Sequence, residues 1–205
     1  MSLSDEHALY QIKQKLGGSI KKRAGVKAIR YRLHHKEGMI ALIERINGNI
    51  RHSARLEQLN KVCLILNIPI IFPNNISINN GWFSGFFDAD GSISYSFKNN
   101  YPQLTISVSN KLEENIKIFK LIFGGNIYFD KSGYGYFKWT IQSQKDIKTF
   151  LNYIKIIPSR SHKRQRLFLV AQFYELNKLK AYKCSPLSAI YKSWVSFEKK
   201  WKERG

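Results

Sequence analysis

The sequence predicts an α+β fold in which an antiparallel sheet packs under helices and one structural unit occurs twice. Strands with alternating apolar and polar residues, and helices with apolar residues at helical spacing, predict the α+β class. A segment near the start of the chain reappears about 107 residues later, which predicts the duplication. A length of 205 residues is sufficient to bury a sizeable core.

The first part of the chain is predicted to form a helix, a hairpin and two further helices. Gly17-Gly18 is a strong helix stop, and Ala24-Gly25 is typical of a hairpin turn. The expected elements are a helix over Glu6–Leu16, strands over Ser19–Arg23 and Lys27–His34, and helices over Glu37–Ile46 and Ser53–Leu66.

A stretch rich in proline and asparagine, from Pro69 to Asn80, is the best candidate for a linker. We therefore expect a first domain over residues 1–68, a linker over residues 69–80 and a second domain over residues 81–205.

The second part contains more strands than the first. Asn99-Asn100 and Ser132-Gly133 are turn signals between runs of alternating polarity. The expected strands are Ser92–Lys98, Gln103–Ser109 and a hairpin within Asn126–Gln142. The expected helices are Gly81–Ala89, Glu113–Phe123, Gln144–Ile156, Ser161–Leu179 and Pro186–Trp201.

The two parts match in pattern at a nearly constant offset. Ile12–Ile20 corresponds to Phe119–Ile127, Ile29–His34 corresponds to Phe137–Gln142, and Arg55 falls on Lys163. A fixed offset through helix, hairpin and helix indicates two copies of one unit. The same offset would place a counterpart of Asp90 about 18 residues before Met1, so we expect a truncated first repeat that lacks its first helix and about two strands.

The composition favours a polyanionic partner. Lysine and arginine number 34 against 14 acidic residues, so the formal net charge is +20. A balance this basic is typical of nucleic-acid binding. No apolar run reaches the roughly 18–20 residues that a membrane-spanning helix needs, so we expect a soluble protein. Heavy use of Ile, Lys, Asn, Phe and Tyr is typical of an A+T-rich coding genome, which suggests a mitochondrion or another organelle.

The polar faces of the expected strands form the candidate nucleic-acid surface. In each strand one face is apolar and the other offers Arg, Lys, His, Gln, Ser or Thr, which can contact phosphates and base edges. The same alternation is also compatible with a solvated surface. The candidate contacts are Lys21, Arg23, Lys27, Arg30, Arg32, His34, Ser94, Ser96, Lys98, Gln103, Lys138, Thr140, Gln142, Arg160 and Arg164.

One short run, Phe83–Gly91, carries the strongest chemical signal. It is apolar up to Phe87 and ends in Asp88-Ala89-Asp90-Gly91. Carboxylates at a helix C-terminus oppose the helix dipole and need a compensating partner, for which a divalent metal is the obvious candidate. The run resembles the nine-residue signature of the LAGLIDADG homing endonucleases and intron maturases. The Gly-Gly, the hairpins and the Lys163 segment occur in that family's order.

The resemblance implies a LAGLIDADG fold, with a β-saddle over nucleic acid and Mg²⁺-dependent phosphodiester cleavage. It implies that Asp90 holds the metal with help from the Ala89 and Gly91 carbonyls. It also implies that Lys163 acts near the cleaved phosphate, while we expect Asp88 to cap or pack the helix end. The face of the signature helix around Ser84, Gly85 and Phe86 is then expected to be open for a second signature helix.

This chain carries the signature once, whereas cleavage of two strands requires two acids. We therefore expect catalysis only if a partner, such as a second polypeptide or a ribonucleoprotein, supplies the missing acidic helix. The alternative is a non-catalytic RNA-binding protein of the same ancestry, a group I intron maturase or an organellar ribosomal RNA-binding component. A transcription-factor-like DNA binder is the least supported reading, because neither a helix-turn-helix nor a zinc motif is evident.

Overall fold

The computed structural model describes residues 1–203, which fall into two compact units, one from Met1 to Trp82 and one from Phe83 onward. Residues 204 and 205, which end the expected second domain, lie outside the described residues.

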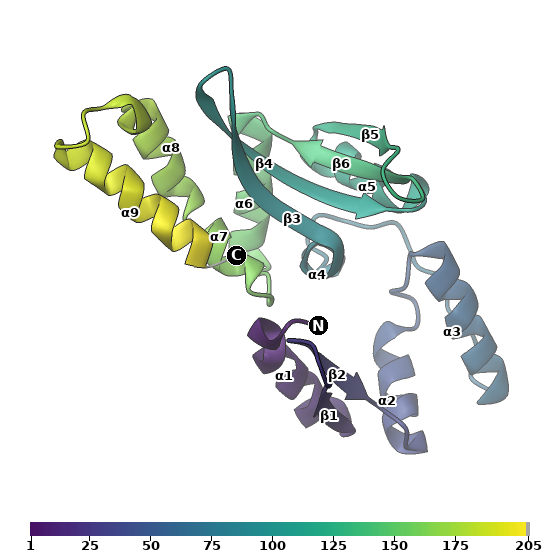
Figure 1. Cartoon of the computed structure of the whole chain (residues 1–205). Helices are drawn as coiled ribbons and strands as arrows, with labels where there is room; N and C mark the ends of the chain where they lie inside the picture. Colours follow the sequence, from purple (N-terminus) through teal and green to yellow (C-terminus); the bar gives the residue numbers. More distant parts are fainter. Residues whose placement is uncertain (204–205) are drawn as a thin grey trace. The chain divides into compact units, whose positions relative to one another are not determined.

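The first unit forms a helix, a two-stranded hairpin and two helices. Its elements are η1 (Leu3–Asp5), α1 (Glu6–Leu16), β1 (Ser19–Lys22), β2 (Ile29–Arg32), α2 (Lys36–Ile46) and α3 (Ser53–Ile65) (Figure 1). The strands β1 and β2 are antiparallel, with Lys21 opposite Arg30. One buried cluster consists of Ile43, Leu59 and Cys63 with partly buried neighbours around it, and Leu9, Leu16 and Ile29 of the first helix and hairpin are buried as well.

The turn from α1 into β1 depends on two glycines. Gly17 and Gly18 both have positive φ, 73° and 82°, which favours glycine. A Cβ on Gly18 would lie 2.4 Å from the carbonyl oxygen of Arg32. The Tyr31 hydroxyl donates a hydrogen bond to the Gly17 carbonyl at 2.9 Å, which ties β2 to the end of α1.

The second unit contains one four-stranded antiparallel sheet in the order β3-β4-β6-β5. Its strands are β3 (Gly91–Lys98), β4 (Tyr101–Asn110), β5 (Asn126–Asp130) and β6 (Tyr136–Ile141). Its helical elements are α4 (Trp82–Asp90), α5 (Glu114–Phe123), α6 (Gln144–Ile156), α7 (Lys163–Leu167), α8 (Val170–Lys178), η2 (Ala181–Lys183) and α9 (Ala189–Glu203). Figure 1 shows α5 and α6 behind the sheet and α8 and α9 side by side.

Aromatic side chains fill the core of the second unit. Phe83 of α4 contacts the rings of Phe119 and Phe123 on α5, each at a centroid distance of 5.2 Å. Trp139 of β6 and Phe150 of α6 are fully buried against this group. These ring contacts hold the signature helix α4 against α5 and α6.

The α5–β5 turn repeats the backbone geometry of the α1–β1 turn. Gly124 and Gly125 have φ of 75° and 78°, and a Cβ on Gly125 would lie 2.4 Å from the Thr140 carbonyl oxygen. The Trp139 indole donates to the Gly124 carbonyl at 2.8 Å, where the first unit uses Tyr31. We call this arrangement the Gly-Gly fastening.

The predicted α+β class is confirmed, but some element boundaries differ. The expected helix over residues 161–179 is two helices, α7 and α8, because the chain turns at Phe168 and Leu169 between them. The last helix begins at Ala189 and not at Pro186.

Candidate metal centre and nucleic-acid surface

The signature helix ends where the sheet begins. Asp90 is the last residue of α4, and Gly91 opens β3. Only glycine fits at position 91, since a Cβ there would lie 2.2 Å from Cδ2 of Phe87. The Asp90 side chain is exposed and forms no hydrogen bond or ion pair with any of residues 1–203. Its carboxylate is therefore available to a cation.

Asp88, two residues earlier, is occupied by the protein. It accepts hydrogen bonds from the Ser159 hydroxyl, from the Ser161 hydroxyl at 2.7 Å and from the Arg160 backbone N–H at 2.7 Å. Ser159 and Ser161 are buried. These bonds attach the end of α4 to the segment before α7, which is a structural role of the kind expected for Asp88.

Lys163 compensates the negative end of the α4 dipole. Its Nζ donates to the Asp88 carbonyl at 2.7 Å, to the Phe87 carbonyl at 3.0 Å and to the Ala89 carbonyl at 3.4 Å. A cation at the last carbonyls of a helix is stabilising. The structure thus places Lys163 beside Asp90, with its ammonium engaged by backbone oxygens.

The end of α4 offers one carboxylate that can serve as a ligand to Mg²⁺. No group of three His, Cys, Asp or Glu side chains that could hold a metal is present among residues 1–203. Mg²⁺ is usually bound by one or two carboxylates and completes its shell with water and substrate phosphates. The Asp90 carboxylate meets the first requirement. The Ala89 carbonyl, already an acceptor from Lys163, is a weaker candidate ligand.

The strand register gathers the sequence-predicted polar residues of the second unit on one face. Ser94 is opposite Thr105, Ser96 opposite Gln103, and Ser109 opposite Lys138. The Gln142 amide donates to the Thr105 hydroxyl at 3.2 Å. This polar face contains Ser92, Ser94, Ser96, Lys98, Gln103, Thr105, Ser107, Ser109, Lys138, Thr140 and Gln142. It has no acid on β3, β4 or β6.

The hairpin of the first unit is basic and exposed. Lys21, Arg30 and Arg32 share one face of β1 and β2, while Arg23 and Lys27 lie in the turn. A hollow of about 270 Å³ is lined by Lys21, Lys22, Arg23, Ala24, Arg30 and Arg32. His34 follows β2 and is exposed. Arg160 and Arg164 are exposed on the second unit, close in sequence to Lys163.

The expected open face of α4 needs a correction at Ser84. The residue is 4% exposed, and its backbone N–H donates to the Tyr153 hydroxyl of α6 at 3.0 Å. Burial raises the pKa of Tyr153 above its ordinary value. Gly85 is exposed, with nothing within 4 Å of an added Cβ, and Phe86 is half-buried against Phe119. The open part of α4 is therefore centred on Gly85.

Sequence reasoning missed the role of Ser159 and Ser161. The signal was present as two serines flanking Arg160 directly after Pro158, which is typical of a turn that offers hydroxyls and N–H groups to an acid. Only the fold shows which acid they contact.

None of the helices formed by residues 1–203 has the length and apolarity needed to cross a membrane.

Comparison with known sequences identifies relatives over nearly the whole chain. The intron-encoded RNA maturase bI4 of Saccharomyces cerevisiae is 52% identical over 98% of this chain, and the match covers 32% of that protein. The probable intron-encoded endonuclease aI2 of Debaryomyces hansenii is 47% identical over the full chain and 34% of the relative. The chain thus spans about a third of the length of these two relatives. The intron-encoded DNA endonuclease ai2b of Dictyostelium discoideum is 36% identical over 87% of this chain and 70% of its own length.

Solved structures show the same fold. The LAGLIDADG homing endonuclease I-GzeII, solved in complex with its DNA target, aligns with a TM-score of 0.73 at 17% identity, covering 97% of this chain and 85% of that one. The LAGLIDADG meganuclease I-AabMI, bound to uncleaved DNA, aligns with a TM-score of 0.70 at 16% identity, over 98% and 86% of the two chains. The LAGLIDADG endonuclease family model matches residues 83–174, from the signature helix into α8. The chain belongs to the LAGLIDADG endonuclease family.

Proposed function

We propose that this protein binds nucleic acid through the polar face of its sheet and the basic hairpin of its first unit. We further propose that Asp90 provides one of two acids in a metal-dependent phosphodiester cleavage centre. The free Asp90 carboxylate, at a helix end compensated by Lys163, is the observation that carries this proposal. The net charge of +20 and the acid-free polar face of β3, β4 and β6 support it.

In the cleavage reaction Asp90 would hold Mg²⁺, with the Gly91 and Ala89 carbonyls as further candidates. Bound there, Mg²⁺ would supply the Lewis acidity that hydrolysis of a phosphodiester requires. Lys163 fixes the end of α4 through its bonds to the backbone carbonyls. Its positive charge favours a substrate phosphate at this end of the helix. Arg160 and Arg164, exposed nearby in sequence, are suited to phosphate contacts.

The second acid must come from outside residues 1–203. The described residues contain one signature helix, and its exposed Gly85 leaves room for the close approach of another helix. We propose that this helix is provided by a second polypeptide chain or by a ribonucleoprotein component. The units 1–68 and 81–205, joined by residues 69–80, then act as a truncated and a complete repeat.

A second candidate function is RNA binding without cleavage. The observation that favours it is the 52% identity over 98% of this chain to a protein named as an RNA maturase. Recognition of RNA by shape and phosphate contacts needs no second acid. The intron-encoded relatives also support our proposal that the protein works in a mitochondrion or a similar organelle.

Binding and cleavage separate these functions. The purified chain would be titrated at 50 and 200 mM salt with an RNA transcript and a DNA duplex of the gene region that encodes it. We expect both affinities to fall steeply with salt. Mg²⁺-dependent DNA cleavage that requires an added acidic-helix partner, and that Asp90→Asn abolishes without loss of binding, would support the nuclease. Glu44→Gln is the matched control, because Glu44 is also exposed and its side chain makes no hydrogen bond or ion pair with any of residues 1–203.

RNA binding with no cleavage under any of these conditions would favour the maturase-like function. Failure to bind either nucleic acid at 50 mM salt would contradict both candidates.

A further inference from the structure

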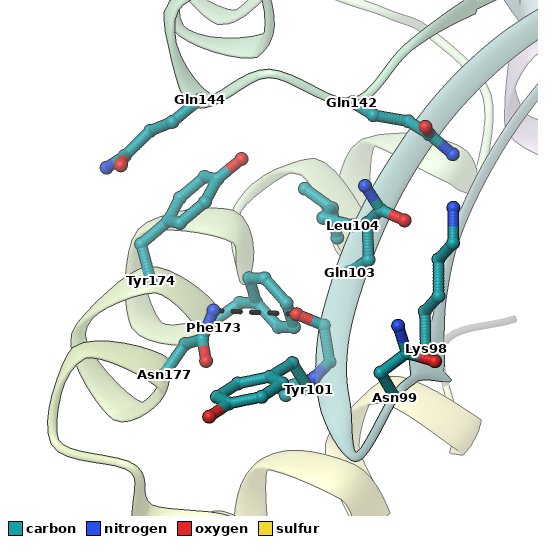
Figure 2. Close-up of a pocket in the computed structure, with 11 residues that line it drawn as sticks. Lys98, Asn99, Tyr101, Gln103, Leu104, Gln142, Gln144, Phe173, Tyr174 and Asn177 are labelled. Atoms are coloured by element: carbon teal, nitrogen blue, oxygen red, sulfur yellow. Dashed lines mark hydrogen bonds between the residues drawn. The ribbon is translucent and has the colours of Figure 1, made fainter.

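A polar cavity of about 460 Å³ opens at one end of the sheet in the second unit (Figure 2). Its size lies within the range of about 300–1,000 Å³ typical of pockets that enclose small organic groups. It lies between the β3–β4 turn, the segment that follows β6 and α8. Its lining consists of Lys98, Asn99, Tyr101, Pro102, Gln103, Leu104, Gln142, Gln144, Phe173, Tyr174 and Asn177.

The lining combines amides with aromatic rings and contains no acid. Most of the amide capacity is unused. Gln103 and Gln144 make no side-chain hydrogen bond with any of residues 1–203. Gln142 uses only its NH₂ group, toward Thr105, and Asn177 donates to the Pro102 carbonyl at 3.5 Å. A carboxamide offers both donors and an acceptor, so these side chains can pair with a planar group that does the same.

Tyr174 adds an unpartnered hydroxyl. Its oxygen is buried and has no hydrogen-bond partner within the described part of the chain, and burial raises the pKa of this residue to about 12. Figure 2 shows the Tyr174 ring extending from α8 toward Gln144. Tyr101 is 53% exposed at the rim, where Lys183 Nζ lies 4.1 Å from its ring centroid.

We propose that this cavity binds one unpaired nucleobase, with its amides and the Tyr174 hydroxyl on the polar edge of the base and Tyr101 against its ring. The proposal rests on the nucleic-acid binding proposed above and adds a specific site to it. Bases displaced from a helix are recognised by hydrogen bonds to their edges and by stacking on aromatic side chains. A base within a duplex is stacked on both sides and cannot enter a cavity. Lys98 and Lys183 are placed to contact the flanking phosphates.

The cavity is continuous with the polar face. Gln103 on β4 and Gln142 directly after β6 belong to both. Their side chains are part of the polar face and also line the cavity. A nucleic acid lying on the polar face would therefore bring a displaced base to the mouth of the cavity. The base can come from a loop or bulge of RNA or from a displaced base of DNA.

The test uses an RNA hairpin with a single bulged 2-aminopurine and the same hairpin fully paired. The whole chain is titrated with each, and affinity and fluorescence are recorded. We expect the bulged hairpin to bind about tenfold more tightly. We also expect a change in 2-aminopurine fluorescence that the paired probe does not show. The corresponding pair of DNA hairpins identifies the source: a preference confined to RNA assigns the site to RNA, and one shared with DNA assigns it to either nucleic acid.

Two variants test whether the preference for the bulged hairpin arises from the cavity. Tyr174→Phe combined with Gln144→Ala should reduce the preference for the bulge about tenfold toward equality, and leave the affinity for the paired hairpin unchanged. Tyr182→Phe is the matched control, because it also removes a buried hydroxyl without a partner but does not line the cavity. Thermal unfolding of each variant checks that the fold is retained.

Equal affinity for bulged and paired hairpins of both nucleic acids would overturn the base-binding site while leaving nucleic-acid binding intact. A preference unchanged by the double variant would also overturn it. Failure to bind any of the hairpins would contradict the proposed function itself.

Discussion

The two Gly-Gly fastenings show what the fold requires and what is free to vary. At α1–β1 and at α5–β5 the glycines have nearly the same positive φ, and the ring side chain of a residue on the second hairpin strand donates to the first glycine's carbonyl. The surroundings differ. Trp139 is fully buried in a large aromatic core, whereas Tyr31 is half-buried beside a two-stranded hairpin.

The polar side chains of the two hairpins also differ. The first carries Lys21, Arg30 and Arg32 on one exposed face, and the second carries Lys138 and Thr140 within a four-stranded sheet. Both units contain the Gly-Gly fastening because it is needed to reverse the chain after a helix. The side chains differ because each hairpin packs on its own core and, as we propose, contacts nucleic acid in its own way.

Replacing the aromatic residue of each Gly-Gly fastening should give the largest difference in stability loss between the two units. Trp139→Ala should lower the free energy of unfolding by about 3–5 kcal/mol, because it removes a fully buried indole. Tyr31→Ala should cost about 1–2 kcal/mol, because that ring is half-exposed. Urea titrations followed by circular dichroism measure both, analysed as two transitions if the units unfold separately. Equal losses would show that the two cores do not differ as described.

Replacing the second glycine should affect both copies alike. Gly18→Ala and Gly125→Ala should each destabilise their unit by about 2–3 kcal/mol, since both add positive-φ strain and a contact with a carbonyl oxygen. Gly25→Ala and Gly133→Ala are controls in the two hairpin turns, where φ is also positive but nothing lies within 4 Å of the added Cβ. If the fastening glycines cost no more than these controls, close backbone approach is not what selects them.

Removing charge should separate the hairpins in nucleic-acid binding. For duplex DNA, each lost phosphate contact lowers the salt slope of the affinity by about 0.9. The triple variant of Lys21, Arg30 and Arg32 to alanine should therefore lower the slope by up to about 3, and Lys138→Ala by about 1. Fluorescence anisotropy between 50 and 200 mM salt measures the slopes. An unchanged slope in the triple variant would exclude the first hairpin from the binding surface.

The basic residues at matching positions after the hairpins should have unequal effects on stability. Lys163 donates to three carbonyls at the end of α4, whereas the Arg55 guanidinium bonds the Gln58 side chain on its own helix at 2.7 Å. Lys163→Met should cost about 1–2 kcal/mol and Arg55→Met less than about 0.5 kcal/mol. Thermal unfolding compares them directly. Equal effects would mean that Lys163 does not stabilise the helix end.

Much of this arrangement could be predicted from local sequence patterns. Period-two alternation placed Ser94, Ser96 and Lys98 on one face of β3, and the paired glycines marked the end of α1 and of α5. These features depend on steric rules that act over a few residues.

Features that depend on distant contacts could not be predicted in this way. Ser84 was expected on an open face, but a nine-residue helix that is apolar on most sides does not reveal which side Tyr153 covers. The cavity is made by Gln103 and Asn177, more than 70 residues apart, and the bonds between Asp88 and Ser159 span a similar separation. Tertiary packing alone brings these side chains together.

The most direct test of the central claim is lysine footprinting of the whole chain with bound RNA or DNA, measured as protection from acetylation by mass spectrometry. If the polar face and the basic hairpin bind nucleic acid, Lys98, Lys138 and Lys21 should be protected. Lys199 and Lys202, exposed on α9, should react as in the free protein. Equal protection of all five lysines, or protection confined to α9, would contradict the assignment of the binding surface.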